Sequence, residues 1–357
     1  MWHALSIALG ASLALIGLWD QFWTILGEGG GPVTRRIAKR IFGSARWLYA
    51  RYPRSRVLSV GGVASVLGTV VFWVVVQWTA WTLIFVGLPE GVVAAGSSEP
   101  AGLAERVYFA GYTLSTLGIG DVQPRGAVAR VLTAAASFNG LVQISFAVGY
   151  LVPIIVAATD KRRVSIWVSC LGESSTDVLV NLWDGRSLDP LPDLLRSLTP
   201  ELALLEQRHL SYPILPYLHS HERSGSIGCS LAVLDDTISL VTMGVDSDQL
   251  DDGSALPPGV LHAFRRALST LVETLATASE QDGTSVPEPP SLGPLRRAGI
   301  PTVDDETFRW RIARLAERRR TLHRLVRMDG WEWAEVLSSD SDQDHEELTS
   351  LYDTESV

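Results

Sequence analysis

The side chains best suited to chemistry lie between residues 105 and 126, where several hydroxyl groups precede two glycines and a carboxylate. This stretch is too short and too polar to cross a membrane, yet long apolar runs flank it on both sides. Irregular backbone is tolerated at membrane depth only where protein buries it or where it lines a water-filled cavity. The pattern therefore predicts a re-entrant loop. Its centre reads Tyr108-Phe109-Ala110-Gly111-Tyr112-Thr113-Leu114-Ser115-Thr116-Leu117-Gly118-Ile119-Gly120-Asp121.

Elsewhere the chain offers no set of nucleophile, base and acid, so we expect no enzyme. His219-x-His221-Glu222, with His209 nearby, has metal-ligand chemistry, but a polar surface is the expected role. Acidic runs at 246–253 and 340–346 each lack ligand positions of an EF-hand calcium loop. We therefore expect no bound metal and no cofactor.

Three apolar runs must position the loop. Residues 57–89 contain no charge over 33 positions, and residues 131–159 contain none over 29. A membrane helix needs about 20. The first run, residues 3–26, is broken only by Asp20 and Gln21 and lacks the basic start of a signal peptide. We expect an N-terminal transmembrane helix within 1–28, and outer and inner helices at 57–86 and 128–158.

Charge sets the expected orientation. Residues 1–159 carry 11 Arg and Lys against 6 Asp and Glu, whereas residues 160–357 carry 19 against 33. The basic loop, residues 29–56, holds eight cations, and such loops face the cytoplasm. The expected product is a plasma-membrane protein with three spans, its N-terminus outside and its C-terminus cytoplasmic. Apolar residues at helical spacing in Arg35–Arg56 predict an interfacial helix that contacts anionic lipids. The acidic net charge argues against a nucleic-acid partner.

The loop resembles the pore helix and selectivity filter of the potassium channel family, whose hallmark is Thr-Val-Gly-Tyr-Gly-Asp. The likeness covers about residues 57–159, less than a third of the chain. Gly140 lies 24 residues after Thr116, at the inner-helix hinge of two-helix bacterial channels. In the hallmark itself, Thr116, Gly118, Gly120 and Asp121 match, Leu117 is a conservative change, and Ile119 replaces the aromatic residue.

The resemblance implies a homotetramer, since one chain supplies a quarter of the ring of carbonyls that replaces the hydration shell of potassium. The carbonyls of residues 116–119 would form the sites, and glycine allows the alternating backbone angles they need. Ile119 cannot make the hydrogen bond with which the family's tyrosine braces the filter. We expect apolar packing of Ile119 against Tyr108 and Phe109 to replace part of that brace. The supporting residues are Tyr108, Phe109, Tyr112, Thr113 and Ser115.

Two faces of the inner helix compete for the cavity. The register of the family favours one stripe, and polar side chains, which avoid lipid, favour the other. The polar side chains of the second stripe would avoid lipid equally well by packing against another helix. Pro153 is expected to kink or end the helix. The first stripe contains Thr133, Ser137, Leu141, Ile144 and Val148; the second contains Asn139, Gln143, Phe146 and Tyr150.

The region after Arg163 shows no nucleotide-binding motif, and its pattern is mainly helical, with strands as an alternative at 226–245. Arginines between 309 and 327 would contact either anionic lipid or acidic side chains of the same domain. The expected divisions are a cytoplasmic domain at 160–280, a linker at 281–303, a basic helical segment at 304–337 and an acidic tail at 338–357.

The sequence thus predicts an all-α membrane protein, with α+β as the alternative for its cytoplasmic domain. Its pore module, residues 57–159, would conduct potassium passively in a bacterial membrane. A weakly selective cation channel and a non-conducting membrane-anchored sensor or adaptor are the alternatives. No motif identifies a gating stimulus.

Overall fold

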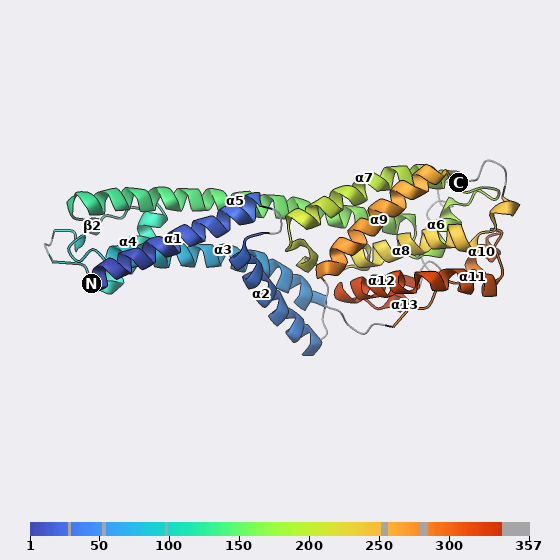
Figure 1. Ribbon diagram of the computed structural model, residues 1–357, viewed down its shortest axis with the longest axis horizontal. Helices are drawn as coiled ribbons and strands as arrows, with labels where there is room; N and C mark the ends of the chain where they lie inside the picture. The colour runs from blue at the N-terminus through green and yellow to red at the C-terminus, as the bar shows by residue number, and fades with distance from the viewer. Residues whose placement is uncertain (28–29, 52–54, 97–98, 251–255, 279–284, 338–357) are drawn as a thin grey trace, which may run out of the picture. The chain divides into compact units, whose positions relative to one another are not determined.

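The computed structural model describes residues 1–27, 30–51, 55–96, 99–250, 256–278 and 285–337, which are predominantly helical (Figure 1). The chain divides into two units. The membrane unit comprises residues 1–53, 60–156 and 211–217, and the C-terminal unit comprises 54–59, 157–210 and 218–357. In the described residues the strands are limited to two short segments, β1 (Val92–Ala94) and β2 (Val122–Pro124). The prediction of an all-α membrane protein is confirmed.

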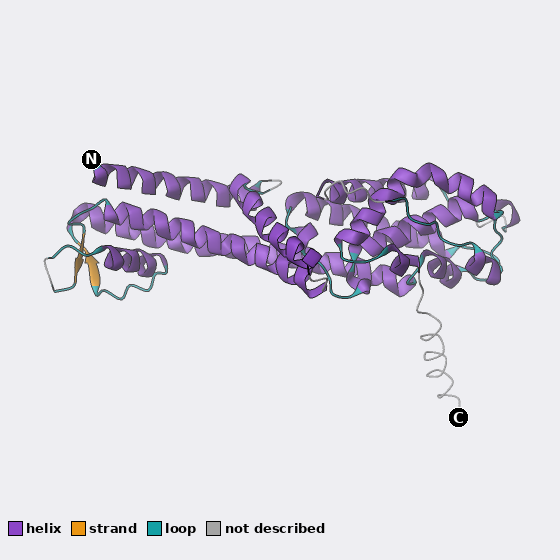
Figure 2. Ribbon diagram, turned by 90° about the horizontal axis from the view of Figure 1, so that it is seen from below, coloured by secondary structure: helices purple, strands orange, loops and turns teal. Residues whose placement is uncertain are grey.

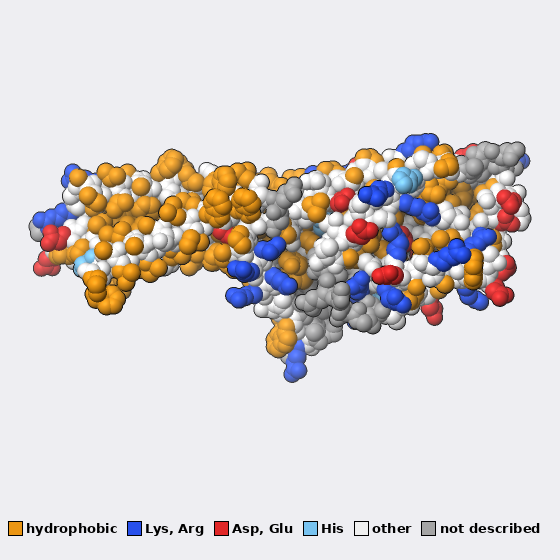
Figure 3. All heavy atoms as spheres, viewed as in Figure 1, with side chains coloured by type: hydrophobic (Ala, Val, Ile, Leu, Met, Phe, Trp, Pro, Cys, Tyr) orange, Lys and Arg blue, Asp and Glu red, His pale blue; other side chains and the backbone are white. Residues whose placement is uncertain are grey.

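Among the described residues, four helices are long and apolar enough to cross a membrane: α1 (Trp2–Leu26), α3 (Ser55–Val86), α5 (Gly126–Leu171) and the stretch Ile227–Gly244. The first three expose much of their apolar surface, and Figure 3 shows hydrophobic side chains covering them on one face. The fourth differs, since 83% of its apolar stretch is buried within the chain. That burial makes it a core helix of the C-terminal unit.

Helices α1 and α3 pack closely through small residues. A Cβ atom at Gly10 would lie 2.6 Å from the Ala80 carbonyl oxygen, so only glycine permits this approach. The Gln77 amide of α3 donates to the Ala14 carbonyl at 3.1 Å. Small residues and interhelical hydrogen bonds are the usual means of helix association in lipid. The additional N-terminal helix is therefore built into the membrane unit.

Helix α2 (Pro32–Arg51) begins against the end of α1. The buried Asp20 carboxylate accepts hydrogen bonds from the backbone of Val33 at 2.9 Å and of Thr34 at 3.1 Å, and from the Thr34 hydroxyl at 2.6 Å. It therefore satisfies amides that the first turn of a helix leaves unpaired, and its charge suits the helix dipole. The Trp73 indole of α3 donates to the same Thr34 hydroxyl at 3.0 Å. One carboxylate thus joins three helices.

The two faces of α2 differ in chemistry. Ala38 and Phe42 are buried, and Ile41 lies over Gly68 of α3, where a Cβ atom would come within 2.5 Å of it. A helix is therefore present where an interfacial one is expected, and Ala38, Ile41 and Phe42 of its apolar face pack on protein. Its exposed cations, gathered at α2 in Figure 3, are Arg35, Arg36, Lys39, Arg40 and Arg51. The side chains of Arg46, Arg54 and Arg56 lie outside what the structure describes.

Between the two long helices of the membrane unit lies α4 (Leu103–Leu114), at the position expected for a pore helix. The antiparallel pair β1 and β2 flanks it, with Val93 opposite Gln123. Helix α5 continues to Leu171, beyond the expected end at 158, and Pro153 lies inside it. Of the two effects expected of Pro153, a kink or an end of the helix, the second is therefore excluded.

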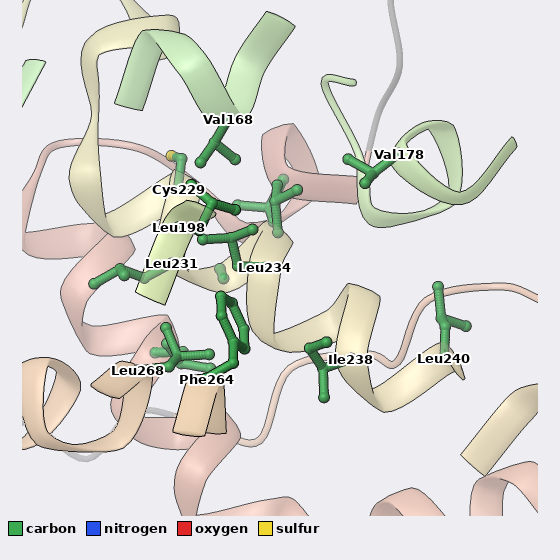
Figure 4. Close-up of a cluster of buried hydrophobic side chains, with 14 of the residues drawn as sticks. Val168, Val178, Leu198, Cys229, Leu231, Leu234, Ile238, Leu240, Phe264 and Leu268 are labelled. Carbon is green, nitrogen blue, oxygen red and sulfur yellow. The ribbon is translucent and has the colours of Figure 1, made fainter. Parts of the chain in front are cut away.

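The C-terminal unit is a helical bundle around a single core (Figure 2). Figure 4 shows Leu231, Leu234 and Ile238 of α8 packing with Phe264 and Leu268 of α9. The alternative of strands at 226–245 is wrong, because this stretch forms α8 and a π-helical turn at Leu240–Gly244. The remaining helices are α6 (Ser175–Leu182), α7 (Pro190–Ser211), α8 (Ile227–Ser239), α9 (Pro258–Ala278), α10 (Gly293–Arg297), α11 (Asp305–Ile312), α12 (Ala316–Met328) and α13 (Trp333–Leu337).

Residues 293–337 share that core instead of standing apart from it. Helix α10 lies within the stretch expected to be a linker, and its Leu295 is fully buried. Arg318 of α12 pairs with Asp235 of α8 at 2.6 Å, and Arg319 pairs with Asp236. Of the two roles considered for the arginine-rich segment, these two cations take the salt-bridged one. The acidic tail, 338–357, lies outside the described residues.

Candidate functional site

Arg106 fixes the start of α4 to the end of α3. Its guanidinium donates to the carbonyls of Phe85, Leu88 (2.7 Å) and Pro89 (2.5 Å), and its Nε donates to Ala101 at 2.8 Å. The last carbonyls of a helix lack intrahelical partners, and a cation there also suits the helix dipole. The side chain is only 6% exposed. Arg106 therefore sets where the short helix enters the membrane unit.

The middle of α4 is held against α3 by aromatic residues. The Trp78 indole donates to the Val107 carbonyl at 2.8 Å, and its ring lies so close to Gly111 that a Cβ atom there would come within 2.8 Å. Phe109 packs edge to face on Phe85, with ring centroids 4.8 Å apart, and on Tyr112, at 5.3 Å. The orientation of α4 is thus determined by a rigid cluster.

The backbone alternates in conformation directly after α4. Thr116, Gly118 and Gly120 have φ values of 60°, 60° and 86°. The intervening Leu117 and Ile119 are not among the residues with positive φ. Left-handed backbone is rare for a residue other than glycine, so Thr116 is held there by its surroundings. The Leu117 amide donates to the Tyr112 carbonyl at 2.9 Å, which ties this segment to the end of α4.

The outer end of the segment is braced from two sides. The Tyr112 hydroxyl donates to the Val122 carbonyl, and the Asp121 carboxylate accepts from the Val122 amide at 3.0 Å. The Ala95 amide next to β1 donates to the Asp121 carbonyl at 2.8 Å. The Tyr108 ring packs edge to face on Tyr112, with ring centroids 5.1 Å apart. Residues 108–122 therefore form one bonded unit.

The apolar residues of the segment point away from this brace. Leu117 is 66% exposed and Ile119 is 53% exposed in the single chain. Phe109, expected to pack on Ile119, is buried and lies on Phe85 and Tyr112 instead. Thr113 is buried and its hydroxyl meets no partner among the described residues, whereas the Ser115 hydroxyl donates to the Tyr112 carbonyl at 3.2 Å.

Helix α5 approaches the end of α4 closely at Gly140. A Cβ atom there would lie 2.6 Å from the carbonyl carbon of Leu114, and closer still to its oxygen. Leu114 is the last residue of α4, immediately before the alternating segment. This contact by itself requires glycine at position 140. The requirement is independent of the hinge role that the resemblance implies.

The structure separates the two competing faces of α5. The Asn139 carbonyl oxygen accepts from the Trp81 indole at 3.3 Å, and Gln143 and Tyr150 are also buried. Tyr150 meets Trp73 of α3 edge to face at 5.1 Å. The polar face thus packs on other helices of the same chain. On the other stripe Thr133 and Ser137 are half-buried, and Leu141, Ile144 and Val148 are each 54% exposed.

Comparison with known proteins fits this arrangement. Residues 64–157 match a family model described as "Ion channel". The ion channel match includes most of α3, all of α4 and the alternating segment, and α5 up to Ala157. The chain is also 29% identical over 331 residues to "Uncharacterized membrane protein YdjJ" of Bacillus subtilis (strain 168), covering 92% of this chain and 94% of that protein. No solved structure matches it.

Several residues that build the site belong to no sequence motif. Arg106, Trp78 and Trp81 act through contacts with residues 17 to 58 positions away in the chain. The sequence signal that could have identified one of them is Arg106, the only charged residue between Glu105 and Asp121. Within the described part of the chain, no three His, Cys, Asp or Glu residues are grouped for a metal, and His219 instead pairs with Asp329 at 3.0 Å.

Proposed function

We propose that the membrane unit is one quarter of a homotetrameric potassium channel. The observation that carries this proposal is the alternation of positive φ at Thr116, Gly118 and Gly120, directly after a short helix fixed between two spans. Alternating backbone angles turn successive carbonyls toward one axis, and rings of such carbonyls replace the hydration shell of a cation. A single chain cannot surround an ion, so four are required.

The carbonyls of residues 116–119 would coordinate potassium, with the Thr116 hydroxyl at the cavity end and Gly120 and Asp121 at the outer mouth. Four chains arranged in this way would bring together the exposed stripe of α5 that contains Leu141, Ile144 and Val148. The permeant ion is the only species bound, and no cofactor, catalytic group or nucleic acid takes part.

In the membrane, we propose three spans, α1, α3 and the first part of α5, with the N-terminus outside. Ile227–Gly244 is not a fourth span, because protein already covers it and its Asp235 and Asp236 pair with arginines. The exposed cations of α2 would then face the inner leaflet of a bacterial plasma membrane. Each is worth about 1 kcal/mol near anionic lipid.

A weakly selective cation channel is the second candidate, and Ile119 favours it. Its side chain makes no hydrogen bond and is half exposed in the single chain. The tyrosine of the family braces the filter at this position. Tyr112, bonded to the Val122 carbonyl, supplies a brace from the pore helix instead.

The deciding experiment reconstitutes the full chain in liposomes with potassium on one side and sodium on the other. A reversal potential near that of potassium supports the first proposal, and a value near zero supports weak selectivity. Gly118→Ala should remove the current in both cases. The φ angle of Gly118 is 60°, a backbone conformation that a side chain disfavours even where space is free. Absence of any ion flux in the unmodified protein would favour a non-conducting sensor.

A further inference from the structure

An open apolar groove runs between α1 and α5 in the membrane unit. Its volume is about 680 Å³, within the range of small-molecule sites. Both helices run alongside each other here (Figures 1 and 2). Its described lining contains no charged side chain. The lining residues are Leu15, Leu18, Trp19 and Phe22 of α1, Trp81 of α3, and Ala135, Phe138, Asn139, Val142 and Phe146 of α5.

One polar group in this groove is unsatisfied. The Trp81 indole can only donate, so the atom of the Asn139 amide that faces it must be the oxygen. The amide nitrogen of Asn139 is then left without an acceptor among the described residues. The side chain is 8% exposed and lines the groove. The nitrogen is accessible from the groove, where a donor without a partner is costly in hydrocarbon.

The depth of Asn139 limits what can supply the acceptor. It lies 13 residues into α5, which is about 20 Å along the helix. The hydrocarbon layer is about 30 Å thick, so the ester oxygens of phospholipids lie at its edges and not at this level. Water is also absent there. The acceptor must therefore belong to a molecule that is itself soluble in hydrocarbon.

We propose that this groove binds an uncharged hydrocarbon chain carrying one hydroxyl or carbonyl oxygen, which accepts a hydrogen bond from the Asn139 amide. The chain would lie along the aromatic wall formed by Trp19, Phe22 and Phe146. Asn139 directly precedes Gly140, which contacts the end of α4 at Leu114. Occupancy would therefore bear on the segment that follows α4. The binding itself does not depend on ion conduction.

The test uses two photoactivatable probes on the intact purified protein: a sixteen-carbon alcohol with a mid-chain diazirine, and the matching alkane without the hydroxyl. Labelled peptides are identified by mass spectrometry. We expect the alcohol to label residues 15–22 and 135–146 about fivefold more than the alkane, the factor for one ordinary hydrogen bond. Equal labelling of these peptides by both probes would contradict a role for Asn139.

Two variants separate the parts of the proposal. Asn139→Leu combined with Trp81→Phe removes the amide donor and the indole donor that it would leave unpaired, so the preference for the alcohol should disappear while alkane labelling remains. Ala135→Phe fills the groove and should reduce both. Val131→Phe is the matched control, since Val131 is exposed on the same face of α5 but outside the lining. It should leave both unchanged, and an equal loss there would overturn the assignment of the groove.

A third part of the experiment tests whether a neighbouring copy of the chain occupies the groove. Each protein is labelled once as the intact oligomer and once after dissociation, and elution volume verifies that the variants remain folded. Labelling of the groove in the intact oligomer supports the proposal. Labelling only after dissociation would mean that a neighbouring copy fills the groove, which would refute it.

Discussion

Gly140 of α5 lies so close to Leu114 of α4 that a methyl group at 140 would sit 2.6 Å from the Leu114 carbonyl carbon. The opposing atoms are backbone, so they cannot move aside as a flexible side chain would. A position in the long helix is thus coupled directly to the residue from which the alternating segment starts. The first prediction follows from this contact.

Gly140→Ala should destabilise the membrane unit by about 1–3 kcal/mol, the usual effect of overpacking. Gly149→Ala is the matched control on the same helix, because a Cβ there meets nothing within 4 Å. Alanine is the better helix former by up to about 1 kcal/mol, so this control should be neutral or stabilising. Thermal unfolding in detergent measures both. Equal stability of the two variants would contradict the contact.

Arg106→Gln should separate α4 from the end of α3. The substitution removes charge-assisted hydrogen bonds to carbonyls of Phe85, Leu88 and Pro89, each worth about 1.5–3 kcal/mol. We expect a large loss of thermal stability and a loss of ion flux in liposomes. Arg130→Gln, at an exposed arginine of α5, should change the melting temperature little. A melting temperature for Arg106→Gln as high as that of the control would argue against this anchor.

Tyr112→Phe should loosen the outer end of the segment while the aromatic cluster stays intact. The ring contacts with Phe109 and Tyr108 remain, and only the hydrogen bond to the Val122 carbonyl is lost. A single bond of about 1 kcal/mol changes a population about fivefold. Bi-ionic reversal potentials should therefore shift toward zero relative to the unmodified protein. Tyr212→Phe, outside the site, serves as the control, and a shift of the same size there would sink the interpretation.

Protonation of His209 should destabilise the C-terminal unit in mild acid. Its Nδ1 donates to the Leu205 carbonyl at 2.8 Å, and burial together with the nearby Lys161 ammonium lowers the pKa of His209 to about 4. The ordinary value of about 6.5 applies after unfolding, so the neutral ring contributes stability above pH 6.5. That contribution is lost as the pH falls from 6.5 toward 4.

This prediction is measured as the change in melting temperature of the intact protein between pH 7.5 and 4.5. The expected loss from His209 is about 2–3 kcal/mol, and His209→Gln should remove that part of the pH dependence. Asp329 does not interfere in this window, because although burial alone would raise its pKa, the hydrogen bond from His219 and the charge of Lys161 hold the pKa of Asp329 well below its usual range. Asp236 acts in the opposite direction, because burial raises its pKa to about 7 and its protonation stabilises the folded unit as the pH falls. The difference between the unmodified protein and His209→Gln therefore isolates the contribution of His209. His262→Gln, at an exposed position of α9, should behave like the unmodified protein. A pH dependence in His209→Gln equal to that of the unmodified protein would assign the effect elsewhere.

The helices and the class of the protein could be predicted because they depend on local properties. The lengths of the uncharged runs at 57–89 and 131–159 determine that helices can span a membrane there, and glycines at 118 and 120 permit an alternating backbone. The roles of residues 116–121 in ion coordination stay a prediction, as does the fourfold assembly.

The tertiary structure alone decided which groups meet. From the sequence, Asn139 could face the cavity or another helix. In the structure its side-chain oxygen lies 3.3 Å from the indole nitrogen of Trp81, 58 positions away, so it faces α3. The pairing of Asp235 with Arg318, 83 positions apart, likewise identifies α8 as a core helix, although its length and apolar composition would allow it to cross a membrane. Helical periodicity specifies which residues share a face, but the rotation and level of each helix come from its packing against the others. The sequence therefore determined the elements, and packing determined their faces.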